Sequence, residues 1–236
     1  QPSQPSQPSQ PSQPSQPSQP SQPSQPSQPS QPSQPSQPSQ PSQPSQPSQP
    51  SEPELKFIDV NEGDWFYNSV MWAVKNGVTV GTTPTTFEPY TACTRAQMIE
   101  FLWNAVGKPA ATIKSVPFTD VPESGSDDYW YEDSLLWAYE AGIVAGTNDG
   151  STFSPDQVCT RAEMISFIAR LLSDGATADM PFVDVPASAW YYNEVQWAWA
   201  NGLTVGTNDG TTFSPDNACI RAEAVEFLYN AFAEVE

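Results

Sequence analysis

Hydrophobic and polar residues follow the same order three times between residues 57 and 232, with a period of about 60 residues. Each copy opens with F-x-D-V and continues through a Trp-rich stretch that ends in glycine. It then has a G-T pair, a polar turn, T-F-x-P, and C-x-R-A before a second apolar stretch. Each copy therefore predicts a helix, a turn, a short extended segment and a second helix.

The first helix of each copy is predicted to begin near one tryptophan and to end at a glycine, which supplies the left-handed backbone that commonly closes a helix. A second tryptophan follows seven residues after the first, which places both on one helical stripe. The positions are Trp65, Trp130 and Trp190, then Trp72, Trp137 and Trp197, and the glycines Gly77, Gly142 and Gly202. Burial of the stripe explains the second tryptophan of each pair. The first, beside a polar loop, is compatible with burial or with an exposed platform on which a ligand stacks.

The turn after the first helix has the sequence G-T-N-D-G in the second and third copies. Asn, Asp and Gly tolerate the positive φ angles of a tight turn, and the Thr-Phe that follows favours an extended backbone. A calcium loop is the alternative, but the ligand spacing of an EF-hand is absent, so we interpret the segment as a turn. The first copy is one residue shorter, and its turn is expected to differ.

The second helix of each copy is predicted to begin with an arginine, at Arg95, Arg161 and Arg221. Thr94 with Gln97, and Thr160 with Glu163, form capping boxes that place the arginine at the first helical position. The helix dipole disfavours a cation there by roughly 0.3 to 1 kcal/mol. Two compatible compensations are possible: an internal ion pair, for instance with the F-x-D-V aspartates Asp59, Asp120 and Asp184, or an external anion bound at the helix N-terminus.

Composition separates the repeats from what precedes them. Residues 1–51 are seventeen consecutive Gln-Pro-Ser triplets, which have nothing to bury, so residues 1–52 are predicted to be a disordered linker. Residues 52–236 carry all the charge, a net −19, which opposes binding to nucleic acid or anionic lipid. No stretch of 18 apolar residues exists, so we predict no membrane insertion.

Candidate catalytic and metal chemistry is sparse. Histidine is absent, which excludes Ser-His and Cys-His catalytic pairs and removes the commonest metal ligand. The three cysteines, Cys93, Cys159 and Cys219, each lie two residues before an arginine. An odd, symmetric set does not suggest a disulfide framework. We interpret them as small buried residues, because a Cys₃ zinc site would require all three to converge and the usual short ligand spacing is missing. We predict no catalytic residue, no metal and no cofactor.

Residues 55–236 resemble the S-layer homology domain family. F-x-D-V, the Trp helix, G-x-x-x-G-T-x-D-G-x-T-F-x-P and the closing T-R-A-E occur in that family's order, in three tandem repeats expected at 53–108, 109–175 and 176–236. The resemblance implies a mainly α-helical, pseudo-threefold spindle with one helix of each repeat in a central bundle and grooves between neighbouring repeats. It also implies an extracellular, monomeric module that binds a secondary cell wall polysaccharide, often capped by a pyruvate ketal whose carboxylate would meet the arginines.

The resemblance also implies the ligand-binding residues. They are the T-R-A-E arginines Arg95, Arg161 and Arg221, the aspartates Asp59, Asp120 and Asp184, the first tryptophans Trp65, Trp130 and Trp190, and the glycines Gly81, Gly146 and Gly206. Gln97 and Ile220 depart from the pattern, so the pocket of Arg161 follows it best.

On these grounds we expect an anchor that holds a surface or secreted protein to a bacterial cell wall. One alternative is a module that builds an S-layer lattice or binds other proteins. Another is a carbohydrate-active enzyme, although its paired carboxylates would have to lie in one asymmetric cleft, whereas here they are spread over three similar units.

Overall fold

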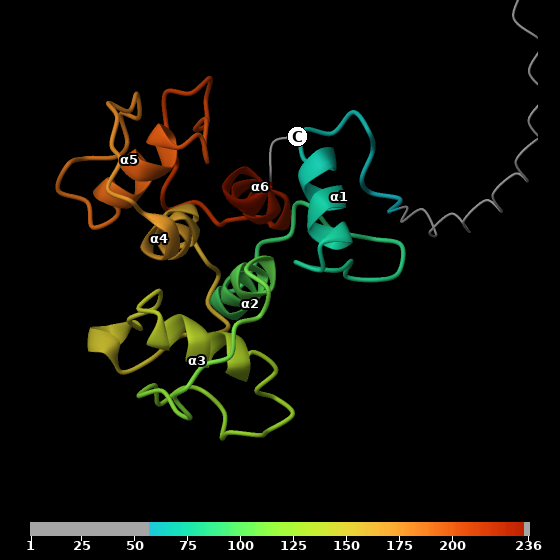
Figure 1. Ribbon diagram of the computed structural model, residues 1–236. Coiled ribbons are helices and arrows are strands. Elements are labelled where there is room, and N and C mark those ends of the chain that lie inside the picture. The colour runs from blue at the N-terminus through green and yellow to red at the C-terminus, as the bar shows by residue number, and fades with distance from the viewer. Residues whose placement is uncertain (1–56, 234–236) are drawn as a thin grey trace, which may run out of the picture. The chain divides into compact units, whose positions relative to one another are not determined.

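The computed structural model describes residues 57–233, and the predicted Gln-Pro-Ser linker lies outside them. This part of the chain contains two α-helices per repeat and one short 3-10 turn. They are α1 (Tyr67–Lys75), α2 (Arg95–Ala105), α3 (Glu132–Glu140), η1 (Asn148–Gly150), α4 (Arg161–Leu172), α5 (Tyr192–Ala200) and α6 (Arg221–Phe232). The second helices α2, α4 and α6 contact one another at the centre, and α1, α3 and α5 surround them (Figure 1). The predicted mainly α, three-repeat architecture is confirmed.

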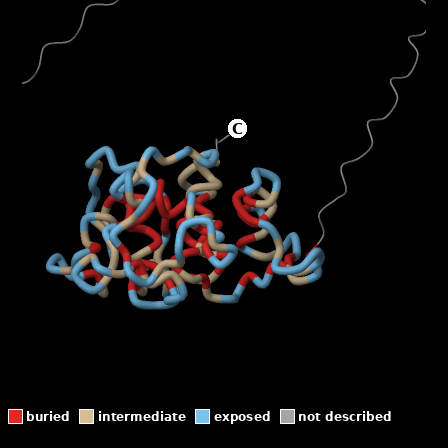
Figure 2. The backbone as a smooth tube through the Cα atoms, turned by 90° about the horizontal axis from the view of Figure 1, so that it is seen from below, coloured by how far each residue is buried: buried red, intermediate tan, exposed pale blue. Residues whose placement is uncertain are grey.

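The repeats are joined in a circle. Helix α3 packs on α2, α5 packs on α4, and α1 packs on α6. Each outer helix therefore covers the central helix of the preceding repeat, and the first repeat covers the last. Buried residues gather in the interior and exposed ones on the loops (Figure 2), with Phe87, Phe153 and Phe213 completely buried in equivalent positions. Because the central helix of each repeat is covered by an outer helix of another repeat, all three repeats share one hydrophobic core.

A ring of backbone hydrogen bonds lies where the three cysteines meet. The Cys93 N–H donates to Cys219 O at 3.1 Å. The Cys159 N–H donates to Cys93 O, and the Cys219 N–H donates to Cys159 O, each at 2.9 Å. All three side chains are fully buried, as small core residues. Burial raises the pKa of the Cys93 thiol to about 11 and raises those of Cys159 and Cys219 well above their usual value. The described residues contain no cluster of three or more Cys, Asp or Glu side chains arranged to hold a metal ion.

The central helices begin where the capping boxes predict. The Gln97 side chain accepts a hydrogen bond from Thr94 N at 3.0 Å, and Thr94 Oγ1 accepts one from Gln97 N at 3.3 Å. Thr160 and Glu163 repeat this pair of bonds at the start of α4. At α6 only half of the box remains, because Ile220 has no side-chain acceptor while Glu223 still accepts from Ile220 N at 3.2 Å.

The outer helices begin later than the tryptophan pattern predicts. Phe66, Tyr131 and Tyr191 are the N-caps of α1, α3 and α5, so the first tryptophan of each pair precedes the helix. Trp65, Trp130 and Trp190 are 57%, 55% and 58% exposed, and the stripe prediction is wrong for them. It is confirmed for the buried Trp137 and Trp197, while Trp72 is half-buried against the core. The glycine ends are confirmed, since Gly77, Gly142 and Gly202 have φ values of 66°, 72° and 71°.

The turn chemistry also follows the sequence. Asn148 and Asp149 have φ values of 45° and 58°, and Thr147 pairs with Thr152 as an isolated β-bridge. The third repeat has the same turn, whereas the first closes through a shorter Thr83 to Thr86 bridge. The predicted extended segments amount to such isolated bridges, and residues 57–233 contain no longer strand.

Candidate functional site

Arg95, the first residue of α2, is buried in the following repeat. Its Nε donates to Phe153 O at 2.9 Å, and its Nη1 donates to Glu163 Oε1 at 2.7 Å. The guanidinium lies over the rings of Phe153 and Phe167, 5.2 and 5.4 Å from their centroids. Only 4% of the residue is exposed. Hydrogen bonds, an ion pair and two cation–π contacts thus hold the cation between repeats.

Arg161 repeats this arrangement between the second and third repeats. Its Nε donates to Phe213 O at 2.9 Å and its Nη1 to Glu223 Oε1 at 2.6 Å. Glu163 and Glu223 each use their other oxygen to cap the start of their own helix. One carboxylate therefore serves two purposes, because it caps one helix and compensates the arginine at the start of the preceding one.

Arg221 closes the circle without a carboxylate. The equivalent of Glu163 in the first repeat is Gln97, whose side-chain oxygen is already bonded to Thr94 N. Its remaining terminal atom is an amide nitrogen, which cannot accept a hydrogen bond. Arg221 instead donates from Nη2 to Val80 O at 2.9 Å and from Nε to Phe87 O at 2.8 Å. Burial lowers the pKa of Arg221, so this joint holds a desolvated cation on neutral acceptors.

The F-x-D-V aspartates form no ion pair with the arginines in the described part of the chain. Asp120 instead accepts hydrogen bonds from the backbone N–H groups of Phe153 and Ser154 at 2.8 and 2.7 Å. Asp59 and Asp184 do the same in their own repeats. Since Arg95 binds the carbonyl of the same Phe153, the aspartate fixes the segment onto which the arginine of the preceding repeat docks.

The predicted glycines are required by close packing. A Cβ on Gly146 would lie 2.6 Å from the Phe118 ring and 2.7 Å from Thr152 O, at a φ of +82°. Gly81 and Gly206 meet the equivalent phenylalanines Phe57 and Phe182. These glycines let the ring of F-x-D-V pack directly under the turn, which sets the shape of the groove wall.

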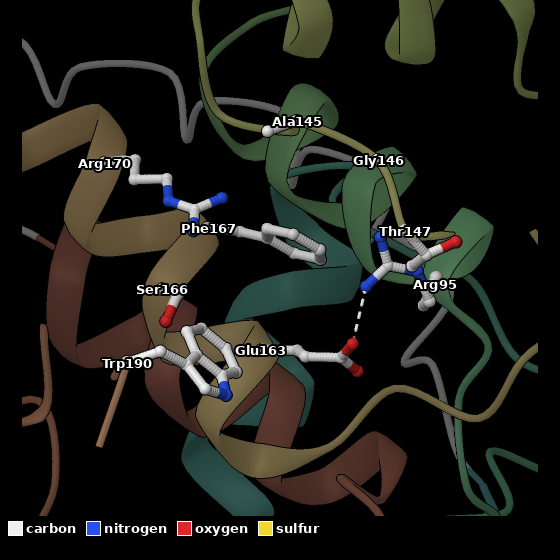
Figure 3. A pocket seen from close by; sticks show the side chains of 9 residues that line it. All are labelled: Arg95, Ala145, Gly146, Thr147, Glu163, Ser166, Phe167, Arg170 and Trp190. Atoms are coloured by element: carbon white, nitrogen blue, oxygen red, sulfur yellow. Dashed lines mark hydrogen bonds and ion pairs between the residues drawn. The ribbon is translucent and has the colours of Figure 1, made fainter. Parts of the chain in front are cut away.

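One cavity of about 200 Å³ brings predicted residues from all three repeats together (Figure 3). Arg95 comes from the first repeat, Gly146 from the second and Trp190 from the third. The other lining residues are Ala145, Thr147, Glu163, Ser166, Phe167 and Arg170, all in the second repeat. The ion pair between Arg95 and Glu163 forms one wall. The exposed indole of Trp190 stands at the edge, with its ring held edge-on against Tyr191, 5.1 Å between centroids.

Sequence reasoning missed the glutamate partners and Arg170 as parts of this site. The glutamates are 62 and 68 residues from their arginines, so no local pattern connects them. For Arg170 a signal existed, because it is the one arginine outside the C-x-R-A motif. Arg161 and Arg221 lie at the two other joints between repeats. Trp65 and Trp130 are exposed like Trp190.

The S-layer homology domain profile matches residues 56–99, 117–165 and 181–225, more than half of the chain. A cell surface protein of Thermoanaerobacter kivui is 35% identical over 133 residues, which is 54% of this chain and 16% of that protein. The S-layer protein sap of Bacillus anthracis is 25% identical over 176 residues, 73% of this chain and 20% of that protein.

An endoglucanase of a Bacillus species is 33% identical over 114 residues, 48% of this chain and 11% of that enzyme. The chain therefore corresponds to a fifth or less of each of these relatives. In the described residues no helix is long and apolar enough to cross a membrane.

Proposed function

The chain belongs to the S-layer homology domain family, whose place is outside the cell at the wall or S-layer, and we propose that it anchors the protein carrying it by binding a carboxylate-bearing secondary cell wall polysaccharide. The attachment is noncovalent, and the polysaccharide is pyruvylated. The observation that carries the proposal is the cavity at which three repeats meet, because it combines a cation with an exposed indole.

These are the groups that an anionic sugar requires. An indole face packs on the apolar face of a pyranose ring, and guanidinium N–H groups pair with a carboxylate in a fork. Arg95 and Gly146 line the same cavity as Trp190. The repeat symmetry leads us to expect two further grooves at the equivalent positions. They would be formed by Arg161, Gly206 and Trp65, and by Arg221, Gly81 and Trp130.

Sedimentation with cell wall sacculi tests the proposal. Residues 52–236 should pellet with sacculi stripped of protein and stay in solution once hydrofluoric acid has removed the secondary polysaccharide. Trp190→Ala should weaken pelleting, because it removes an exposed platform without emptying the core. Sedimentation that survives polysaccharide removal would contradict the proposal.

The two alternatives predict different results. A lattice or protein-binding module would require protein on the wall and would not bind stripped sacculi. An enzyme would release soluble reducing sugar from them. The matched family is a binding module, and the matched region is only a small share of the endoglucanase, so we expect retention without release.

A further inference from the structure

We infer that the three grooves are unequal and that the groove over α4 is the principal anion site, with Arg170 as the residue that pairs with the sugar carboxylate. The inference rests on the proposed function and adds to it a specific residue and a stoichiometry. It comes from comparing the three central helices position by position, because differences between repeats cannot be explained by the shared packing.

Arg170 occupies the place of Asn104 in α2 and Asn230 in α6. All three side chains donate to the carbonyl that follows the glycine end of the preceding outer helix: Arg170 to Ile143 O at 2.9 Å, Asn104 to Val78 O at 3.0 Å and Asn230 to Leu203 O at 3.3 Å. Asparagine is therefore sufficient for the structural bond. The arginine adds a positive charge and further N–H donors.

Arg170 is available for a ligand, unlike Arg95. The residue is exposed, and it belongs to neither of the two ion pairs formed within residues 57–233. It lines the cavity next to Phe167 (Figure 3). Since Arg95 and Glu163 compensate each other at 2.7 Å, the lining residues of the cavity carry one net positive charge, located on Arg170.

Two other differences open the same groove. Ser166 stands where α2 and α6 have Glu100 and Glu226, and its hydroxyl is turned inward to Ala162 O at 2.8 Å. Ala145 stands where the other repeats have the exposed valines Val80 and Val205. Both changes shorten the side chain, and Ser166 places no carboxylate among the residues that line the cavity. The charge of Arg170 and the two shorter side chains thus favour an anion in this groove over the other two.

The third repeat carries a carboxylate on its outer helix in place of the one that Ser166 lacks on the central helix. Helix α5 has Glu194 where α1 and α3 have Ser69 and Ser134. One carboxylate oxygen of Glu194 is buried with no hydrogen-bond partner among the described residues, and Glu194 is not among the residues that line the cavity. The lining therefore keeps the positive charge of Arg170.

The ligand chemistry that fits is a sugar carboxylate stacked beside Trp190 and paired with the fork of Arg170. A pyruvate ketal and a uronic acid both supply such a group. Mild acid removes the ketal and leaves a uronic acid intact, whereas carbodiimide activation followed by borohydride reduces the carboxylate of either group to an alcohol. Binding that is lost after mild acid indicates the ketal, and binding that survives mild acid but is lost after reduction indicates the uronic acid. Polysaccharide treated in these two ways distinguishes the sources.

The test is a calorimetric titration of residues 52–236 with soluble polysaccharide released from stripped sacculi. We expect one principal site per chain and an affinity at least tenfold lower in Arg170→Asn, which corresponds to the roughly 1.4 kcal/mol of one lost charge-assisted contact. The unfolding midpoint should not change, because asparagine makes the carbonyl bond in the other two repeats. Arg170→Gln is the second variant should Arg170→Asn fold poorly.

The reciprocal variant tests sufficiency. Val205→Ala, Glu226→Ser and Asn230→Arg together give the groove over α6 the side chains of the groove over α4, and should raise the number of sites per chain from one to two. Arg170→Asn that binds within twofold of the unmodified chain would overturn the inference and leave the proposed function standing. Failure of the unmodified chain to bind the polysaccharide would overturn the proposed function, and the inference with it.

Discussion

Replacing Arg161 with methionine should destabilise the fold strongly, although the residue lies in a predicted ligand-binding motif. Methionine keeps much of the apolar stem between Phe213 and Phe227 but removes the guanidinium. The change abolishes the 2.6 Å ion pair with Glu223 and the 2.9 Å bond to Phe213 O. It also removes the cation from two ring faces 5.0 and 5.2 Å away.

The magnitude follows from burial. Breaking a buried ion pair typically costs about 3 to 5 kcal/mol, because the remaining charge stays in the protein without its partner. The side chain of Glu223 is 21% exposed, so water partly solvates the stranded carboxylate, and we expect the lower end, about 3 kcal/mol. Urea unfolding measures this as a lower midpoint at an unchanged slope.

Glu223→Gln is the matched control, since it reproduces the joint of Gln97 and Arg221, in which the glutamine stands in place of the glutamate and does not pair with the arginine. It should cost less than Arg161→Met, about 1.5 kcal/mol for one charge-assisted bond. The double variant should cost less than the sum of the two, because the residues contact each other. A loss below about 1 kcal/mol in Arg161→Met, together with a large loss of polysaccharide affinity, would refute the structural role and show that the arginine serves an external anion.

Three further results are expected. Gln97→Glu should stabilise the fold by about 1 to 2 kcal/mol in urea unfolding, because it offers Arg221 the carboxylate that the other two joints have; a loss of stability would contradict the proposed joint. Gly146→Ala should cost at least about 2 kcal/mol more than Gly175→Ala, since both glycines have a φ of +82° but only the first would clash. The three cysteines should react with a thiol reagent at pH 8 only after unfolding, because they are buried and protonated; above pH 9 the raised thiol pKa values should lower stability as the unfolded chain loses those protons first.

The helix ends that could be predicted from the sequence are those set by residues close together along the chain. The starts of α2 and α4 follow from capping boxes four residues long, and the ends of the outer helices from single glycines. The start of α1 has no such signal, because Phe66 makes no side-chain cap, and the helix was expected too early. The pattern therefore places Trp65 on the buried face, although Phe66 is buried and Trp65 is exposed. A seven-residue spacing describes a helical face only if both residues lie in the helix, and Trp65 precedes α1.

The candidate site could be predicted only in part, because it is built across joints. Arg95, Gly146 and Trp190 were each named from their own repeat, but their meeting in one cavity depends on the circular packing of α3 on α2 and α5 on α4. The F-x-D-V aspartates are one possible partner of the arginines in the sequence, whereas Arg95 and Arg161 pair with the glutamate of the next R-A-E and Arg221 bonds to backbone carbonyls. The sequence of a repeat predicts its two helices and its turn. Which residues of another repeat they contact depends on how the three repeats close into a ring.

The four arginines show how the ring divides structure from recognition. Arg95, Arg161 and Arg221 occupy the same position, one in each repeat. Each donates hydrogen bonds to backbone carbonyls of the next repeat around the ring, and Arg95 and Arg161 also pair with a glutamate there. A contact that must form at every joint is kept at every joint, so symmetry in the sequence indicates packing. Arg170 breaks the symmetry, and its one structural bond is made equally well by asparagine elsewhere. Because asparagine makes the same carbonyl bond, the fold does not require this charge, which is why we propose that Arg170 serves the ligand.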